Sequence, residues 1–199
     1  LSPYRENELL NSAALVKVKD MFSLQYFAHE SPQGKDVSTL AKDSGYKYIS
    51  VGENLAMGNF KDDKALVAAW MASPGHRANI LDPKFIDMGV AVMKGTYQGK
   101  SVWMAVQEFG RPTSDCPRVD FSLKEKIDAN SKSLKELEKT LEAQRTEIES
   151  MNKSDPQYNQ NVKEYNELIN QYERFFEETQ KLVIDYNSQV RKFNACALE

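Results

Sequence analysis

The second half of the sequence carries a regular hydrophobic pattern. Mostly apolar side chains advance by alternating steps of four and three residues over two stretches, which Ser154-Asp155-Pro156 separates. The first comprises Leu123, Ile127, Leu134, Leu137, Leu141, Ile148 and Met151, with Asn130 and Gln144 as polar members of the same register; the second comprises Tyr158, Val162, Tyr165, Ile169, Tyr172, Phe176, Thr179, Val183, Tyr186, Val190 and Phe193. This is the seam spacing of a coiled coil. It predicts two long helices, at about 120–151 and 156–194, that form an antiparallel coiled-coil hairpin, with Pro156 at the first helical position of the second.

The first half mixes two periodicities. Residues 4–26 have helical spacing, and shorter helices are predicted from Asp36 or Ser38 to Lys42 and over 62–71. Residues 86–92 and 102–109 alternate between apolar and polar side chains, which is typical of strands. Helices followed by an antiparallel meander predict an α+β domain in which the helices pack on a sheet.

Glycine and proline mark the boundary between the two halves. All nine glycines lie between residues 34 and 110, whereas residues 119–195 contain no glycine and only one proline. Residues 110–117 have the composition of a linker. We therefore expect two domains, 1–115 and 116–199.

The predicted second hairpin helix has an aromatic stripe. Its members are Tyr158, Tyr165, Tyr172, Tyr186 and Phe193. The stripe is either a surface for a protein partner or for self-association, or a set of rings that pack over the smaller first helix. We favour packing, because aromatic side chains at seam spacing usually belong to a core.

The two cysteines fit the hairpin. Cys116 and Cys196 match no metal-binding spacing, but folding the chain back near residue 153 brings them together at the hairpin base. A disulfide there would close a loop of about 80 residues and stabilise the hairpin by about 4 kcal/mol in the chain-entropy model. Two unrelated thiols are the alternative. A disulfide predicts an oxidising location: secreted, on the cell surface or periplasmic.

Charge and hydropathy exclude two classes of function. The formal net charge is -3 and the pI about 5.6, without a basic arm in either half, which argues against nucleic-acid binding. No apolar run approaches the roughly 18 residues of a membrane-spanning helix. The sequence opens with Leu-Ser-Pro and without an apolar signal peptide, so we expect a trimmed mature product, and whether a lipid anchor preceded Leu1 stays open.

Four segments of the first half carry distinctive motifs. They are Tyr26-Phe-Ala-His-Glu-Ser-Pro-Gln-Gly34, Gly52-Glu-Asn-Leu-Ala56, Trp70-Met-Ala-Ser-Pro-Gly-His-Arg-Ala-Asn-Ile-Leu81 and Val106-Gln-Glu-Phe-Gly110, which we expect to be loops. In this order and at this spacing they resemble the bacterial branch of the CAP superfamily (cysteine-rich secretory protein, antigen 5 and pathogenesis-related-1; SCP-like). The resemblance covers about residues 4–110, and the hairpin lies outside it.

The resemblance implies an α-β-α sandwich with a cleft lined by two histidines and acidic residues. Carried over to this sequence, these are His29, Glu53 and His76, with Glu108 or Glu30 as the fourth member. Plant and animal members place a histidine in a His-Tyr-Thr-Gln stretch, where this sequence reads Met-Ala-Val-Gln at 104–107. His76 would therefore have to supply the second imidazole from a neighbouring segment.

Three kinds of chemistry suit these residues. Imidazole and carboxylate ligands suit Zn²⁺ or another divalent cation. Alternatively, a histidine oriented by a glutamate acts as a general base on water or on a hydroxyl such as that of Ser31 or Ser73. No Gly-x-Ser-x-Gly motif supports a serine hydrolase. In the third interpretation the histidines only hold the loops together.

The predicted function is that of a secreted or surface CAP-domain protein that binds rather than turns over its ligand. The cleft would hold a divalent metal or a small ligand, and the family adds sterols and other lipids as candidates. The hairpin would act as a spacer or docking arm. A His/Glu or metal-dependent hydrolase, and a structural surface protein without a cleft ligand, are the alternatives.

Overall fold

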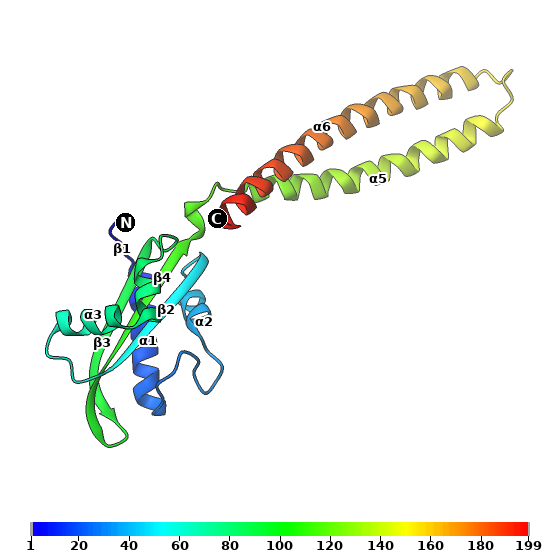
Figure 1. The fold of residues 1–199 in the computed structure, drawn as a ribbon. Coiled ribbons are helices and arrows are strands. Elements are labelled where there is room, and N and C mark those ends of the chain that lie inside the picture. The colour runs from blue at the N-terminus through cyan, green and yellow to red at the C-terminus, as the bar shows by residue number, and fades with distance from the viewer. Residues whose placement is uncertain (1, 199) are drawn as a thin grey trace. The chain divides into compact units, whose positions relative to one another are not determined.

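The computed structural model describes residues 2–198, and its contacts divide the chain into two compact units, Leu1–Asp115 and Cys116–Glu199. The N-terminal unit contains β1 (Arg5–Glu6), α1 (Glu8–Leu24), α2 (Val37–Asp43), β2 (Tyr48–Gly58), α3 (Asp63–Ala72), α4 (Pro74–Leu81), β3 (Asp87–Tyr97), β4 (Lys100–Pro112) and the 3-10 helix η1 (Thr113–Asp115). The C-terminal unit contains α5 (Phe121–Ser150) and α6 (Tyr158–Leu198). Figure 1 traces both units.

A four-stranded sheet in the order β1-β3-β4-β2 forms the middle layer of the N-terminal unit. β4 pairs antiparallel with β2 on one side and with β3 on the other, while the short β1 runs parallel to β3. A two-residue turn joins β3 to β4; its residues, Gln98 and Gly99, both have positive φ, which matches the twist of a tight hairpin. β2 is therefore an edge strand next to β4.

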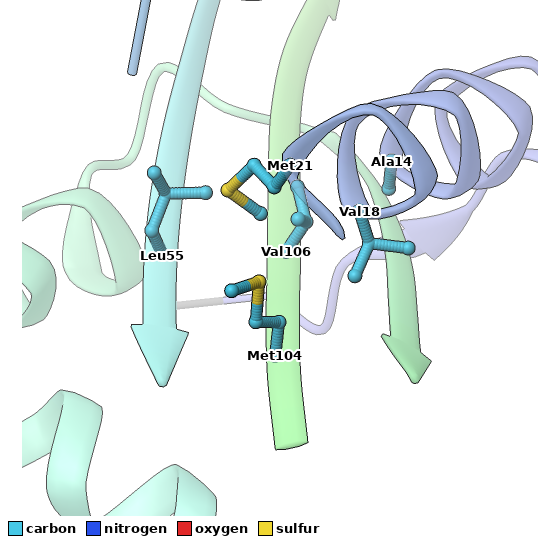
Figure 2. Packing of buried hydrophobic residues seen from close by; sticks show 6 residues of the cluster. All are labelled: Ala14, Val18, Met21, Leu55, Met104 and Val106. Carbon is cyan, nitrogen blue, oxygen red and sulfur yellow. The ribbon is translucent and has the colours of Figure 1, made fainter. Parts of the chain in front are cut away.

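Helices cover both faces of this sheet. On one face α1 contributes Ala14, Val18 and Met21 to a buried cluster with strand residues Leu55, Met104 and Val106 (Figure 2). On the opposite face Leu66 and Trp70 of α3 pack against Ala105 of β4, and Ile80 of α4 joins them. Because side chains alternate along a strand, Ala105 and Val106 point to different layers. This is the α-β-α sandwich expected for the fold class.

Two parts of the sequence-based description were wrong. Three motif segments that were expected as loops are regular structure: 52–56 lies inside β2, most of 70–81 lies in α3 and α4, and 106–110 belongs to β4, where it continues the strand predicted over 102–109. The strand pattern of β2 is hidden because inward positions are occupied by polar side chains, such as that of Glu53. The first helix begins only at Glu8, because the side chain of Asn7 caps it by accepting from Leu9 N and Leu10 N.

α1 lies very close to β3 at one glycine. A Cβ built on Gly89 would come within 2.2 Å of the backbone carbon of Leu10. The next amide, Val90 N, donates to Asn11 Oδ1 at 2.9 Å. The missing side chain at residue 89 thus sets the distance between helix and sheet.

The C-terminal unit is a helical hairpin, as predicted. Its α5 side uses the predicted seam, where Leu134 is buried and Asn130 Nδ2 donates to Thr179 Oγ1 at 3.1 Å. α6 begins at Tyr158 rather than Pro156, because Asp155 and Pro156 form a turn in which Asp155 Oδ1 accepts from Gln157 N. The predicted disulfide between Cys116 and Cys196 is present.

The α6 side of the hairpin is rotated relative to the predicted seam. Asn161 Nδ2 lies 3.3 Å from Met151 Sδ of the α5–α6 connection, and Gln189 Oε1 accepts from Asp120 N at the start of α5. These residues precede by one position the seam residues Val162 and Val190 that the spacing predicted. Rows one residue apart differ by about 100° around a helix, so Val162 and Val190 flank the contact with α5 instead of centring on it.

Within residues 2–198, no helix is both long enough and apolar enough to cross a membrane.

Gly89→Ala should destabilise the N-terminal unit by about 1–3 kcal/mol, because its methyl group would displace the backbone of α1. Gly75→Ala is the matched control, since a Cβ there meets nothing within 4 Å and its effect should be neutral or slightly stabilising. Both tryptophans lie in this unit, so urea unfolding followed by tryptophan fluorescence measures its stability. Equal stabilities for the two variants would contradict the close approach.

The double variant Cys116→Ser/Cys196→Ser should lower the free energy of unfolding of the hairpin by about 4 kcal/mol, because the disulfide closes a loop with a sequence separation of 80. Far-UV circular dichroism, dominated by α5 and α6, should show the loss, whereas the tryptophan transition of the N-terminal unit should stay in place. An unchanged hairpin transition would show that the two helices hold together without the clasp.

Candidate functional site

Strand pairing brings two glutamates together. Glu53 of β2 and Glu108 of β4 are direct partners across the antiparallel ladder, so their side chains leave the sheet on the same face. This is the face that α1 covers, and both residues are buried. The sheet therefore places two carboxyl groups side by side beneath α1.

His29 lies on the segment between α1 and α2 and contacts the first of these glutamates. Its Nδ1 is 2.6 Å from Glu53 Oε1. The His29 side chain is 65% exposed and that of Glu53 only 1% exposed, so a buried carboxyl group anchors an imidazole at the surface. Where the imidazole is neutral and Glu53 ionised, Nδ1–H donates to Glu53 and the Nε2 lone pair is left for a ligand.

Glu108 lacks hydrogen-bond partners among the described residues. Neither of its carboxyl oxygens has one, and Glu53 Oε2 is equally unpaired. Burial, followed by the charge of Glu53, raises the pKa of Glu108 to about 8, while Lys17 opposes the shift. Burial also raises the pKa of Glu53, against the opposing hydrogen bond from His29 and the charge of Lys17. At neutral pH the pair therefore holds a proton on Glu108.

Lys17 of α1 completes the site, and the sequence analysis missed it. The side chain is 1% exposed, and its ammonium group donates to the backbone carbonyl of His29. Burial lowers the pKa of Lys17, whereas the charges of Glu53 and Glu108 raise it. A signal was available: Lys17 lies three residues after Ala14 and four before Met21, on the buried side of the helix.

His76 lies on the other side of the sheet layer. It belongs to α4, which packs with α3, and its backbone carbonyl accepts from Asn54 Nδ2 at 3.1 Å. Asn79 of α4 donates to Glu53 O and Asn54 Oδ1. These bonds attach α4 to β2, mainly through Asn54. The side chain of Asn54 points to the layer of α4, whereas that of the adjacent Glu53 points to the layer of α1.

The remaining predicted residues, Glu108, Glu30 and Ser31, differ in burial and in their contacts. Glu108 lies beside Glu53, whereas Glu30 is exposed, which favours Glu108 as the fourth member. Ser31 is buried, and its Oγ accepts from Gln33 N and Lys35 N, so it stabilises the turn of its own loop. Over residues 2–198 no three His, Cys, Asp or Glu side chains are grouped so that they could hold a metal ion.

The arrangement fits a proton-binding and hydrogen-bonding site better than a metal centre. A divalent cation between Glu53 and Glu108 would lie near the buried ammonium group of Lys17, which would repel it. The second predicted imidazole, that of His76, is not grouped with His29 and Glu53. Of the three predicted ligands, only His29 and Glu53 are in contact within residues 2–198.

The α-β-α sandwich and its His/Glu pair define the class of protein. Residues 1–109 match the model of the Cysteine-rich secretory protein family (CAP), and the chain belongs to this family. Its CAP domain is of the bacterial type: the chain is 39% identical over 103 residues to the uncharacterised protein YkwD of Bacillus subtilis, covering 52% of this chain and 38% of that protein.

Further similarities also cover only part of the chain. The uncharacterised membrane protein YlbC of Bacillus subtilis is 30% identical over 79 residues, which cover 40% of this chain and 22% of YlbC. An extracellular SCP-domain protein from Bacillus anthracis is similar at 28% identity and a TM-score of 0.48, over 56% of this chain and 34% of that one. An outer surface protein from Borrelia burgdorferi is 18% identical with the same TM-score, over 56% of this chain and 80% of that one. The chain thus spans less than two fifths of either Bacillus subtilis relative.

The stability of the N-terminal unit should fall as pH rises from about 5 to 8. The unfolded chain releases the Glu108 proton near 4.5 and the folded chain near 8, so the folded state binds the extra proton in this window and loses its advantage above it. Glu108→Gln should make the decline shallower. Urea unfolding followed by tryptophan fluorescence at several pH values measures the slope.

The exposed Glu30 offers a matched control. Glu30→Gln removes a carboxyl group from the same unit at an exposed position. The free energy of unfolding of this variant should decline with pH as steeply as that of the parent chain. A parent slope that survives Glu108→Gln unchanged would show that Glu108 is ionised in the folded protein at neutral pH.

Proposed function

We propose that this CAP-domain protein acts outside the cytoplasm and binds a small ligand at the exposed imidazole of His29. The observation that carries the proposal is the contact between an exposed imidazole and a buried carboxyl group, 2.6 Å apart. Such an anchor fixes the orientation of the ring and determines which nitrogen faces the ligand. The ligand class is a small molecule with a hydroxyl or amide N–H that donates to Nε2.

The charges around the pair support binding of an uncharged donor group. Lys17 and Glu53 offset each other, and Glu108, with its pKa raised to about 8, is neutral near pH 7. The site thus has little net charge to attract a strongly charged ligand. Its buried oxygens are rigidly placed by paired strands, which favours recognition of one geometry.

A divalent metal remains the second candidate from the sequence. The three carboxyl oxygens of Glu53 and Glu108 without hydrogen-bond partners favour it, because cation binding would satisfy them. The buried ammonium of Lys17 and the position of His76 on the other layer count against it. We therefore rank the metal-free site first.

A hydrolase is the third candidate. The His29–Glu53 pair has the geometry of a general base and its orienting carboxylate. Neither predicted hydroxyl within residues 2–198 is placed for it: Ser31 Oγ accepts from two backbone amides, and Ser73 lies directly before α4, so the attacking group would be water. A lipid ligand is not supported by the polar character of these residues.

The disulfide supports a location outside the cytoplasm, because such bonds persist in oxidising compartments. In that setting the hairpin serves as a spacer or docking arm whose two helices extend from one covalent base. The proposed coiled-coil character of this arm rests on the heptad spacing of α5 and α6.

His29 should carry its proton on Nδ1 and leave Nε2 free near pH 8, because Glu53 accepts from Nδ1. The chain has only two histidines, so long-range ¹H–¹⁵N spectra of the rings resolve both, and His76→Ala assigns them. Phenol, acetamide and glucose serve as probes that offer a hydroxyl or amide donor. Binding of a probe should shift Nε2 of His29 and leave His76 unmoved.

Two variants separate the candidates. Glu53→Gln retains an acceptor for Nδ1 and should preserve the tautomer, whereas Glu53→Ala should lose both the tautomer and the probe response. No response of His29 in the parent chain to any probe would contradict the proposal. Saturable Zn²⁺ binding in calorimetry that disappears in His29→Ala/His76→Ala would favour the metal. Hydrolysis of 4-nitrophenyl acetate lost in His29→Ala and kept in His76→Ala would favour the enzyme.

A further inference from the structure

The helix α6 has a wider apolar face than α5. On α5 the apolar positions form two rows of heptad spacing, the number that a partner helix in a two-stranded coil requires. On α6 they form three. The central row is Tyr158, Tyr165, Tyr172, Thr179, Tyr186 and Phe193; the second contains Leu168, Phe175 and Leu182; the third, here the outer row, contains Val162, Ile169, Phe176, Val183 and Val190. Three rows are typical of a helix in a bundle.

Contacts show which two rows α5 uses. In the central row, Thr179 accepts from Asn130 of α5, and Tyr172 OH donates to Glu138. In heptad register with the second row are Gln189, which accepts from the N-terminus of α5, and Cys196, which forms the disulfide. The outer row lies on the other flank of the central row, and its middle residue, Phe176, is 42% exposed.

The hairpin alone buries little. Among the described residues of α5 and α6, only Leu134 and Thr179 are buried. Two helices of 30 and 41 residues therefore hold their apolar side chains only half covered. A second pair of helices would complete the core, as in a four-helix bundle.

Charge is segregated along the hairpin. The half near the α5–α6 connection, 136–150 with 158–178, has ten acidic and four basic residues. The half near the disulfide, 121–135 with 179–198, has seven basic and three acidic residues. Each half thus combines like charges from the two helices, which disfavours pairing within the hairpin. A second hairpin in the opposite direction would place each acidic half over a basic half.

From these observations we infer that two copies of this chain associate through the outer rows of their α6 helices, in antiparallel orientation and related by a two-fold axis near Phe176. Phe176 is the midpoint of the outer row, 14 residues from both Val162 and Val190. Antiparallel pairing therefore places Phe176 against its own copy and Val162 against Val190. The row extends over about 40 Å of helix. This inference is independent of the ligand at His29.

Sedimentation equilibrium of the full chain tests the association. The parent should dimerise at micromolar concentration, and rising salt should weaken the dimer because the pairing of acidic and basic halves is screened. Phe176→Glu should weaken dimerisation at least about tenfold. Phe121→Glu, which changes an aromatic side chain that is 68% exposed outside the outer row, is the matched control and should dimerise as the parent does. Far-UV circular dichroism verifies that each hairpin is folded.

Cross-linking tests the orientation. Chains with Val162→Cys are mixed with chains with Val190→Cys and treated with a short bismaleimide, which leaves the native disulfide intact. Antiparallel pairing predicts cross-links between the two variants and few within either. A parent that stays monomeric, equal dimerisation by Phe176→Glu and Phe121→Glu, or predominant cross-links between two Val162→Cys chains would each overturn the inference.

Discussion

The burial of two facing carboxyl groups beneath a helix is the constraint on which the N-terminal unit depends. Glu53 and Glu108 are adjacent across the ladder, so their repulsion and desolvation must be offset locally. The offsets are the proton on Glu108, the imidazole of His29 and the ammonium of Lys17. Because Lys17 is on α1, the site depends on how closely this helix lies to the sheet. Gly89, which lets the backbone of α1 approach β3, therefore supports the site although it is no part of it.

The features that could be predicted from the sequence are those that local patterns determine. Heptad spacing and cysteine placement predicted the hairpin and its clasp, because both are local patterns with a single geometric solution. The two-layer covering of the sheet followed from the family resemblance. β2 was missed because Glu53 and Asn54 interrupt its hydrophobic alternation. Glu53 belongs to the candidate site, and Asn54 attaches α4 to the strand.

The candidate site was only half predictable for a related reason. His29 and Glu53 could be carried over by motif, but the pairing of Glu53 with Glu108 depends on strand register, which one sequence does not specify when the strand itself is unrecognised. His76 lies in an equally distinctive motif, yet its helix packs on the other layer. Lys17 was overlooked because lysine is rarely buried without a partner, and the carbonyl of His29 and the carboxyl groups of Glu53 and Glu108 lie more than ten residues away in sequence.

The two units differ in what they bury: the N-terminal unit buries charged side chains, whereas the hairpin leaves apolar side chains partly exposed. The N-terminal unit encloses charged groups and offsets them one by one with residues of its own chain. The hairpin has a disulfide at its base, few buried side chains and like charges gathered at each end, so its own chain leaves both apolar surface and charge uncompensated. Of the described residues of this two-helix arm, only Leu134 and Thr179 are buried. Its outer row and charge pattern are complementary to the same surface turned end over end, and a two-fold pairing is the smallest assembly that satisfies both.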